Sequence, residues 1–257
     1  MSRNGVRQLV NVVAVVIVLA VNTLANILPL NGQTTGEISH RFQVYFVPAG
    51  YVFSIWGLIY LGLVAFAIYQ ALPAQGANPS LQRIGYWFAV SCLANSVWIF
   101  LWHYEVFVAT IAVMLLLLAS LIVIYLRAGI GRTPASAAVK WLVHIPFSLY
   151  LGWITVATIA NASAVLAFLR WDGFGISAVV WAIVMLVLAA AVTSVVALTR
   201  RDVAYVLVIA WALVGIAVKD AATPTIAVAA ALATVVVTLA LAVGRGRQPL
   251  GGSARPS

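Results

Sequence analysis

Long apolar runs, separated by short polar segments, dominate the chain. Eight of them approach the roughly 20 residues that a helix needs to cross a lipid bilayer. They cover residues 9–30, 51–72, 84–103, 106–126, 138–169, 175–198, 203–218 and 223–243. The run at 138–169 is too long for a straight crossing, and Pro146 predicts a kink or a short interfacial turn near its start. The pattern predicts an all-α, polytopic transmembrane bundle of about eight helices.

The composition agrees with lipid as the main solvent. Hydrophobic residues make up 65% of the 257-residue chain and charged residues only 7%, whereas a soluble domain carries roughly 25% charged residues. The first run is longer than the roughly 7–15 residues of a signal-peptide core, so we expect it to remain as the first helix. Cys92 is the single cysteine, which excludes a disulfide within the chain.

The basic residues predict the orientation in the membrane. If the N-terminus is inside, the cytoplasmic segments carry Arg3, Arg7, Arg83, Arg127, Arg132, Lys140, Arg200, Arg201, Arg245, Arg247 and Arg255. The opposite side carries only Arg41, Arg170 and Lys219. The positive-inside rule describes this bias, so we expect both termini to be cytoplasmic, in a bacterial cell membrane.

The distribution of these charges argues against a nucleic-acid partner. The net charge is +9, but the basic residues stand singly at the ends of apolar runs instead of forming a phosphate-binding patch. The segment 244–257 is basic and rich in glycine and proline, and we expect it to be a disordered cytoplasmic tail.

Signatures of catalysis and of metal binding are absent from the sequence. The three histidines (His40, His103 and His144) lack metal-ligand spacing, and the five acidic residues lie in predicted loops or at helix ends. Known nucleophile, phosphate-loop and zinc motifs are missing. Lys219 lies at a predicted helix end beside Asp220, which argues against a retinal Schiff base at the midplane. We therefore expect no enzyme, no metal and no required cofactor.

The stretch from Pro48 to Tyr60 joins the longest outer loop, 31–50, to an apolar helix. Phe53, Trp56 and Tyr60 are spaced i, i+3 and i+7, so a helix places them on one face. One interpretation is an interfacial aromatic belt with ordinary packing. The other is one wall of a pocket for a flat apolar ligand, with the loop as its lid.

Two further runs carry tryptophans and amides on single faces. Their spacings group Asn95 with Trp98 and Trp102, and Trp153 with Ala157 and Asn161. The predicted topology brings these faces to similar depth beneath the outer loop, which favours the pocket. The aromatic belt explains Tyr51 and Trp102 best, and interhelical hydrogen bonding is the preferred interpretation of Asn22 and Asn26.

Three of these patches resemble the TspO/MBR family of tryptophan-rich sensory or translocator proteins. Pro48, Trp56 and Tyr60 match its second-helix pattern, although its first tryptophan is missing and Tyr51 or Phe53 stands near that place. LANSVW and PFSLYLGWITVATIAN match its third and fifth helices, with Pro146 three residues further from Trp153 than in the family. The resemblance covers about residues 9–169.

The resemblance implies a five-helix core at 1–170 with the outer loop 31–50, followed by three additional helices at 171–243. It implies a pocket under the loop that takes a hydrophobic planar ligand, such as a porphyrin, a heme-type molecule or a sterol. Together with the aromatic stripe it gives the expected ligand-binding residues: Phe53, Trp56, Tyr60, Asn95, Trp98, Trp153, Ala157 and Asn161. The expected partners are the lipid bilayer, this ligand and, optionally, a second copy of the chain. The alternatives are a secondary transporter of a small solute and a porphyrin-modifying enzyme.

Overall fold

The computed structural model describes residues 3–28 and 30–246, and every regular element within them is helical. The long helices are α1 (Arg3–Ile27), α3 (Ile55–Ala71), α5 (Trp87–His103), α6 (Phe107–Arg127), α8 (Ile145–Phe168), α9 (Ala178–Arg200), α10 (Val203–Lys219) and α11 (Pro224–Gly246). Three short helices are α2 (Thr35–His40), α4 (Pro79–Ile84) and α7 (Ala137–Val139). The long helices correspond one to one with the eight predicted runs.

Six of these segments are long and apolar enough to cross a membrane, and α5 and α10 are shorter apolar helices of 17 residues each. Their outer surfaces are apolar as well: Leu61, Leu93 and Val187 are each more than 60% exposed. Such surfaces require lipid as solvent. The predicted all-α, polytopic membrane bundle is confirmed, and the protein is an integral membrane protein.

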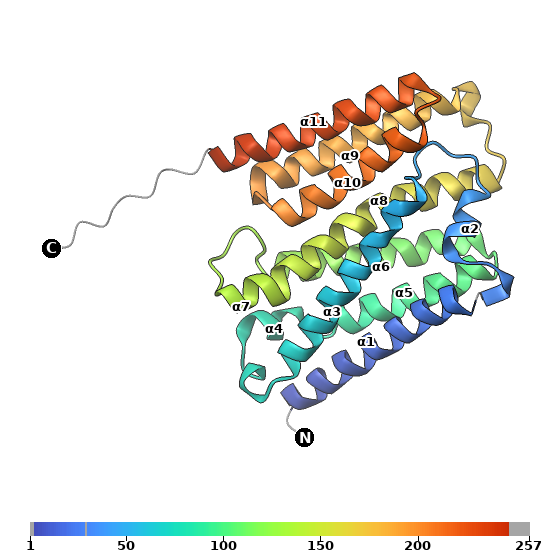
Figure 1. Cartoon of the computed structure of the whole chain (residues 1–257). Helices are drawn as coiled ribbons and strands as arrows, with labels where there is room; N and C mark the ends of the chain where they lie inside the picture. The colour runs from blue at the N-terminus through green and yellow to red at the C-terminus, as the bar shows by residue number, and fades with distance from the viewer. Residues whose placement is uncertain (1–2, 29, 247–257) are drawn as a thin grey trace.

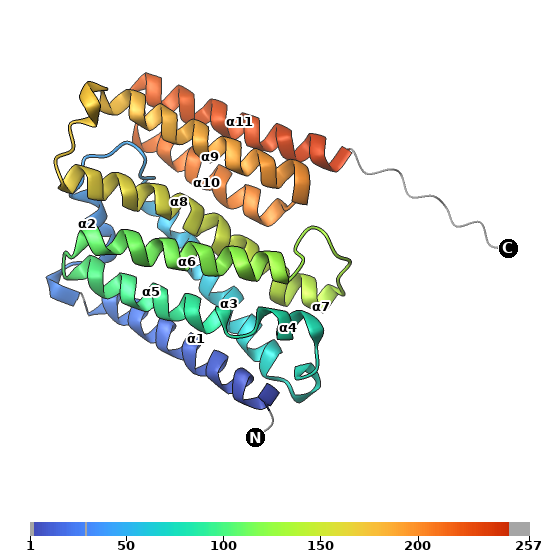
Figure 2. The same cartoon turned by 180° about the vertical axis from the view of Figure 1, so that it is seen from behind.

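The helices form two groups (Figure 1). In the core group, α5 packs against α1 and α6, while α8 packs against α3 and α6. The remaining helices, α9 to α11, pack on one another and reach the core mainly through α10 against α8. Figure 2 shows the same two groups from behind. We call the end that carries α2 and the loop 31–50 the loop face, and the end where α1 begins and α11 ends the terminal face.

Close packing and buried hydrogen bonds join α10 to α8. A Cβ at Gly152 of α8 would lie 3.1 Å from the carbonyl oxygen of Tyr205, so only glycine permits this approach without a shift. The Tyr205 hydroxyl donates to Thr155 at 3.1 Å. The buried carboxylate of Asp202, which caps α10, accepts hydrogen bonds from Tyr125 and Ser148 of the core. The three-helix group is therefore fixed firmly to the core.

Some predicted boundaries are wrong, for local reasons. The run at 84–103 is broken at Gly85, whose φ of 61° ends α4, and α5 begins only at Trp87. The run at 51–72 begins as a 3₁₀ turn, Gly50–Ser54. Near Pro146 the sequence predicts a kink or a short turn, and the structure has a π-helical turn, Lys140–His144, directly before α8. The predicted disordered tail 244–257 starts too early, because α11 continues to Gly246; residues 247–257 lie outside the described residues.

The described basic residues separate between the two ends of the bundle. The terminal face carries Arg7, Arg83, Arg127, Arg132, Lys140, Arg200, Arg201 and Arg245. The loop face carries Arg41, Arg170 and Lys219. This arrangement follows from the alternating directions of the helices and agrees with the grouping on which the orientation was predicted.

Candidate functional site

A cavity of about 430 Å³ lies inside the core group, toward the loop face. Its volume falls within the roughly 300–1,000 Å³ of ordinary small-molecule sites. It is lined by Asn22, Asn26, Thr34, Thr35, Gly36, His40, Gly50, Phe53, Trp56, Tyr60, Asn95, Trp98, Ile99, Met114, Leu117, Trp153, Ile154 and Ala157. Of the eight residues expected to bind ligand, only Asn161 is missing from this lining.

Aromatic rings from α3 and α8 form one wall of the cavity. The indoles of Trp56 and Trp153 lie 6.2 Å apart between centroids, at an interplanar angle of 77°. Phe53 contacts Trp153 edge to face at 5.4 Å, and Tyr60 stacks on Trp56 at 5.2 Å. Phe53 lies in the 3₁₀ turn instead of the α-helix, yet it still lines the cavity with Trp56 and Tyr60. Such edge-to-face pairs fix ring orientation.

A chain of amides and a hydroxyl fixes the polar part of the wall. The amide nitrogen of Asn22 donates to Asn95 Oδ1 at 2.7 Å, and Asn95 Nδ2 donates to the Tyr150 hydroxyl at 3.0 Å. All three side chains are buried. Asn22 therefore joins α1 to α5, as the sequence favoured, and also lines the cavity. Its part in the cavity was missed because interhelical bonding alone explained it.

Asn161 lies behind Trp98, outside the cavity lining. Its Oδ1 accepts a hydrogen bond from the indole nitrogen of Trp98 at 3.1 Å, so it sets the orientation of that ring. It lines an adjoining space of about 50 Å³ that also touches Trp98, Trp153 and Ala157. Its amide nitrogen is buried and has no acceptor among the described residues. Asn161 thus offers a free donor next to the tryptophan wall.

The loop 31–50 covers the cavity, and its short helix α2 is anchored to α5. A capping box starts α2: the Thr34 side chain accepts from the Glu37 backbone, and the Thr34 N–H donates to the Glu37 carboxylate at 2.7 Å. This bond lowers the pKa of Glu37. The indole of Trp102 donates to the Thr35 carbonyl at 3.3 Å, and Arg41 pairs with Glu105 at 2.8 Å.

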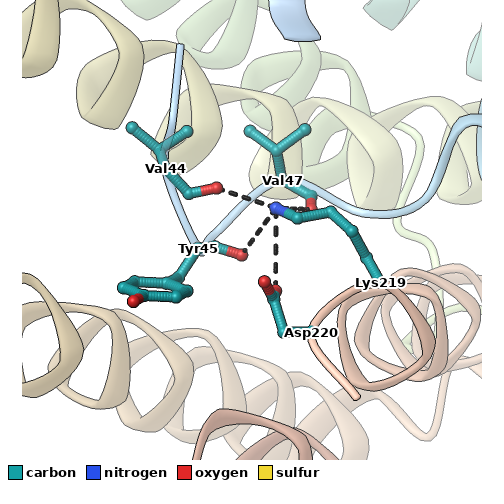
Figure 3. Close-up of polar contacts among 5 residues, drawn as sticks. All are labelled: Val44, Tyr45, Val47, Lys219 and Asp220. Atoms are coloured by element: carbon teal, nitrogen blue, oxygen red, sulfur yellow. Dashed lines mark hydrogen bonds and ion pairs between the residues drawn. The ribbon is translucent and has the colours of Figure 1, made fainter. Parts of the chain in front are cut away.

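The second half of the loop is held by Lys219, at the end of α10 (Figure 3). Its ammonium group donates to the carbonyl oxygens of Val44 at 2.7 Å and Val47 at 2.8 Å, with a longer bond of 3.3 Å to Tyr45. Asp220 lies 3.6 Å away and supplies the opposite charge. The lysine thus supplies a donor to the Val44 and Val47 carbonyls, while the Tyr45 carbonyl also accepts from the Val47 N–H at 2.9 Å.

Next to Lys219, the loop lies directly against the α10 backbone. The Ala49 N–H donates to the Gly215 carbonyl at 3.2 Å, and the Trp211 indole donates to the Val52 carbonyl at 3.3 Å. A Cβ at Gly215 would overlap Cγ2 of Val52 and lie 3.1 Å from Pro48 Cβ. The absence of a side chain at Gly215 therefore permits the loop to reach Phe53 and the cavity in its observed position.

Several lining residues carried no signal in the sequence. Met114 and Leu117 are apolar residues of the strongly apolar helix α6, and only the buried hydroxyl residues Thr110 and Ser120 gave a weak sign of its inward face. Thr35 and His40 lie on α2, inside a loop whose position depends on distant contacts. Within residues 3–28 and 30–246, no group of three or more His, Cys, Asp or Glu side chains could hold a metal ion.

Comparisons with known proteins place the chain in a family. No curated protein and no solved structure matches it. A family model described as TSPO-like protein matches residues 8–243. This match extends beyond the resemblance at residues 9–169 and includes the three C-terminal helices. Because it covers most of the chain and all eight long helices, the chain belongs to the family of TSPO-like proteins.

Proposed function

We propose that this membrane protein binds a hydrophobic planar ligand, such as a porphyrin or a sterol, in the cavity beneath the loop 31–50. The observation that carries the proposal is the convergence of Trp56, Trp98 and Trp153 from three different helices on one cavity of about 430 Å³. Indole rings offer large, rigid stacking surfaces at low entropic cost. Membership of the family supports the same choice of ligand class.

The polar groups suit recognition of a few ligand atoms. Asn95 is held in place by Asn22 and Tyr150, so its amide is preorganised. Among the residues that line the cavity, His40 is the one titratable side chain apart from Tyr60. A ligand with a mostly apolar body and one or two hydrogen-bonding groups fits this balance. The lining supports binding more directly than catalysis, because it offers no acid–base pair.

We further propose that the loop face lies outside the cell and that both termini are cytoplasmic. The separation of basic residues between the two ends of the bundle supports this orientation. The ligand would then enter from the outer side, beneath α2. The same proposal includes location in a bacterial cell membrane and pairing with a second copy of the chain. Crosslinking in membranes tests the pairing.

Ligand binding is tested with protoporphyrin IX and the purified protein in detergent. Quenching of tryptophan fluorescence gives the affinity for the native chain and for Trp153→Ala. We expect at least about a tenfold loss of affinity, because a buried stacking surface is removed. Trp87→Ala, which removes an indole near the terminal face outside the cavity, is the matched control and keeps the native affinity. Equal affinities in the native chain and Trp153→Ala would reject this site.

A further inference from the structure

A second cavity, of about 760 Å³, lies at the junction of the core with the three-helix group. It extends along α8 and α10 from the terminal face as far as Trp211. Because α10 begins at Val203 and rises 1.5 Å per residue, the eight residues from there to Trp211 correspond to about 12 Å. This space is separate from the tryptophan cavity: it shares none of the residues that line that site.

The two ends of this cavity differ in chemistry. Lys140, Arg200, Arg201 and Arg245 line its end at the terminal face. Further along, the lining is apolar and includes Leu149, Leu207 and Trp211. Leu207 is 56% exposed and Leu58, on the opposite α3 side, is 49% exposed, so the apolar part opens toward the membrane. The cavity therefore has a cationic head and a hydrophobic body.

The positive charge at this end is not balanced from within. Among the lining residues Asp202 is the one acid, and His144 is the one titratable side chain besides this acid and the four cations. The Asp202 carboxylate already accepts hydrogen bonds from the hydroxyls of Tyr125 and Ser148 and from the backbone of Tyr205. Four cationic side chains therefore line the cavity together with one acid, whose carboxylate is already occupied by these three hydrogen bonds.

Arg201 is the most informative of the four. It ends α9 in the left-handed conformation, with φ of 57°, and lines the cavity. Its Nε is buried and has no acceptor in residues 3–28 and 30–246. A cation that served only to orient the chain would point into water, where its donors are satisfied. A buried, unpaired guanidinium donor costs free energy, which an anion would recover.

We propose that this cavity binds an anionic phospholipid. Its phosphate accepts hydrogen bonds from Arg201 and is attracted electrostatically by the neighbouring cations, since the planar guanidinium matches phosphate oxygens. One acyl chain lies along the apolar part between α8 and α10. Bound in this way, the lipid fills the space between the core and the three-helix group. The α10 helix of this group supports the loop over the tryptophan cavity. The proposal does not depend on the ligand of that cavity.

Native mass spectrometry of the full-length protein in detergent tests the proposal, with phosphatidylglycerol as the probe. We expect one tightly retained lipid on the native chain. Lys140→Gln with Arg245→Gln removes two exposed cations of the cavity without disturbing the interior. At roughly a fivefold effect per cation near an anionic head group, the affinity should fall more than about tenfold. Arg83→Gln with Arg127→Gln removes equal charge from exposed positions elsewhere on the terminal face and should leave binding unchanged.

Two further arms identify the ligand chemistry. Leu207→Trp adds bulk to the apolar part without changing charge, and we expect it to expel the lipid. Inorganic phosphate at millimolar concentration should not displace phosphatidylglycerol. Equal losses of lipid affinity in the cavity variant and the control variant would show that general surface charge causes the effect, and would overturn the proposal. Displacement by inorganic phosphate, or native affinity in Leu207→Trp, would replace the lipid site with a small-anion site and overturn it as well.

Discussion

The ammonium group of Lys219 lies 2.7 Å from the carbonyl oxygen of Val44, a residue 175 positions earlier in the chain (Figure 3). This hydrogen bond ties the end of α10 to the loop that covers the tryptophan cavity. The same helix contacts Ala49 and Val52, which lie four positions and one position before Phe53 of the cavity wall. The three-helix group therefore takes part in shaping the candidate site, and its contacts can be tested one at a time.

Removing the ammonium group should loosen the covering loop. In Lys219→Met, the carbonyls of Val44 and Val47 lose a charged donor, and hydrogen bonds to charged groups contribute about 1.5–3 kcal/mol. Because the Lys219 side chain is 27% exposed, we expect a loss of stability at the lower end of this range. Such a loss corresponds to about tenfold faster hydrogen exchange at the Ala49 amide. Lys140→Met, an exposed lysine at the other end of the bundle, should leave this exchange rate unchanged; an equal rate in both variants would contradict the anchoring role.

A methyl group at position 215 should push the loop away from α10. In Gly215→Ala the added Cβ overlaps Val52, and overpacking of this kind costs about 1–3 kcal/mol. We expect a lower melting temperature in detergent and weaker binding of protoporphyrin. Gly57→Ala is the matched control, because a Cβ at that membrane-facing position meets nothing within 4 Å. It should be neutral or slightly stabilising, and similar destabilisation in both variants would contradict the proposed contact.

The amide chain should contribute to stability through its buried partners. Asn95→Leu deprives Asn22 of an acceptor and Tyr150 of a donor, and we expect a loss of about 1–2 kcal/mol in unfolding free energy. Ser96→Ala, on the same helix, removes only a local bond to the Cys92 carbonyl and should cost less than about 1 kcal/mol. Denaturant titration in mixed micelles distinguishes the two. A cost no larger for Asn95→Leu than for Ser96→Ala would show that the network is not stabilising.

The N-terminal cap of α2 should weaken at acid pH. The Thr34 N–H bond holds the pKa of Glu37 below its usual value of about 4.3. A carboxyl whose folded pKa is depressed stabilises fully above the unfolded pKa, and this stabilisation is lost as pH falls through the folded pKa. We therefore expect the protection factors of the α2 amides to fall below about pH 4.3. Glu37→Gln should abolish this dependence, and an unchanged profile in the variant would exclude the carboxyl as its cause.

Periodicity was sufficient to predict the helices and most of the cavity wall. Trp153 and Ala157 are spaced to share a face of α8, and Phe53, Trp56 and Tyr60 to share a face of the preceding segment, so packing the helices brings them together. Helices that contact lipid need apolar residues on their outer side as well, however. An apolar inner face therefore cannot be distinguished from the outer side by hydrophobicity. Met114 of α6 was missed for this reason, although the buried Thr110, one turn before it, was a weak sign of the inner face.

The support of the loop could not be predicted from sequence. Lys219 bonds to backbone carbonyls, which every residue possesses, so nothing in the sequence of residues 44–47 marks them as its partners. Gly215 differs from other helical glycines only in what lies against it. Asn161 was placed on the correct face, but one layer of packing separates it from the cavity that Trp98 touches.

The central claim is that the cavity itself receives the planar ligand, and blocking it provides the most direct test. Ala157 lines the cavity on α8 and is partly buried, so Ala157→Phe fills the space while every tryptophan remains available as a fluorescent reporter. The measurement is protoporphyrin IX quenching of the purified variant, with its melting temperature as the check of folding. We predict a folded protein whose affinity falls at least about tenfold. Native affinity in a folded Ala157→Phe variant would contradict the claim.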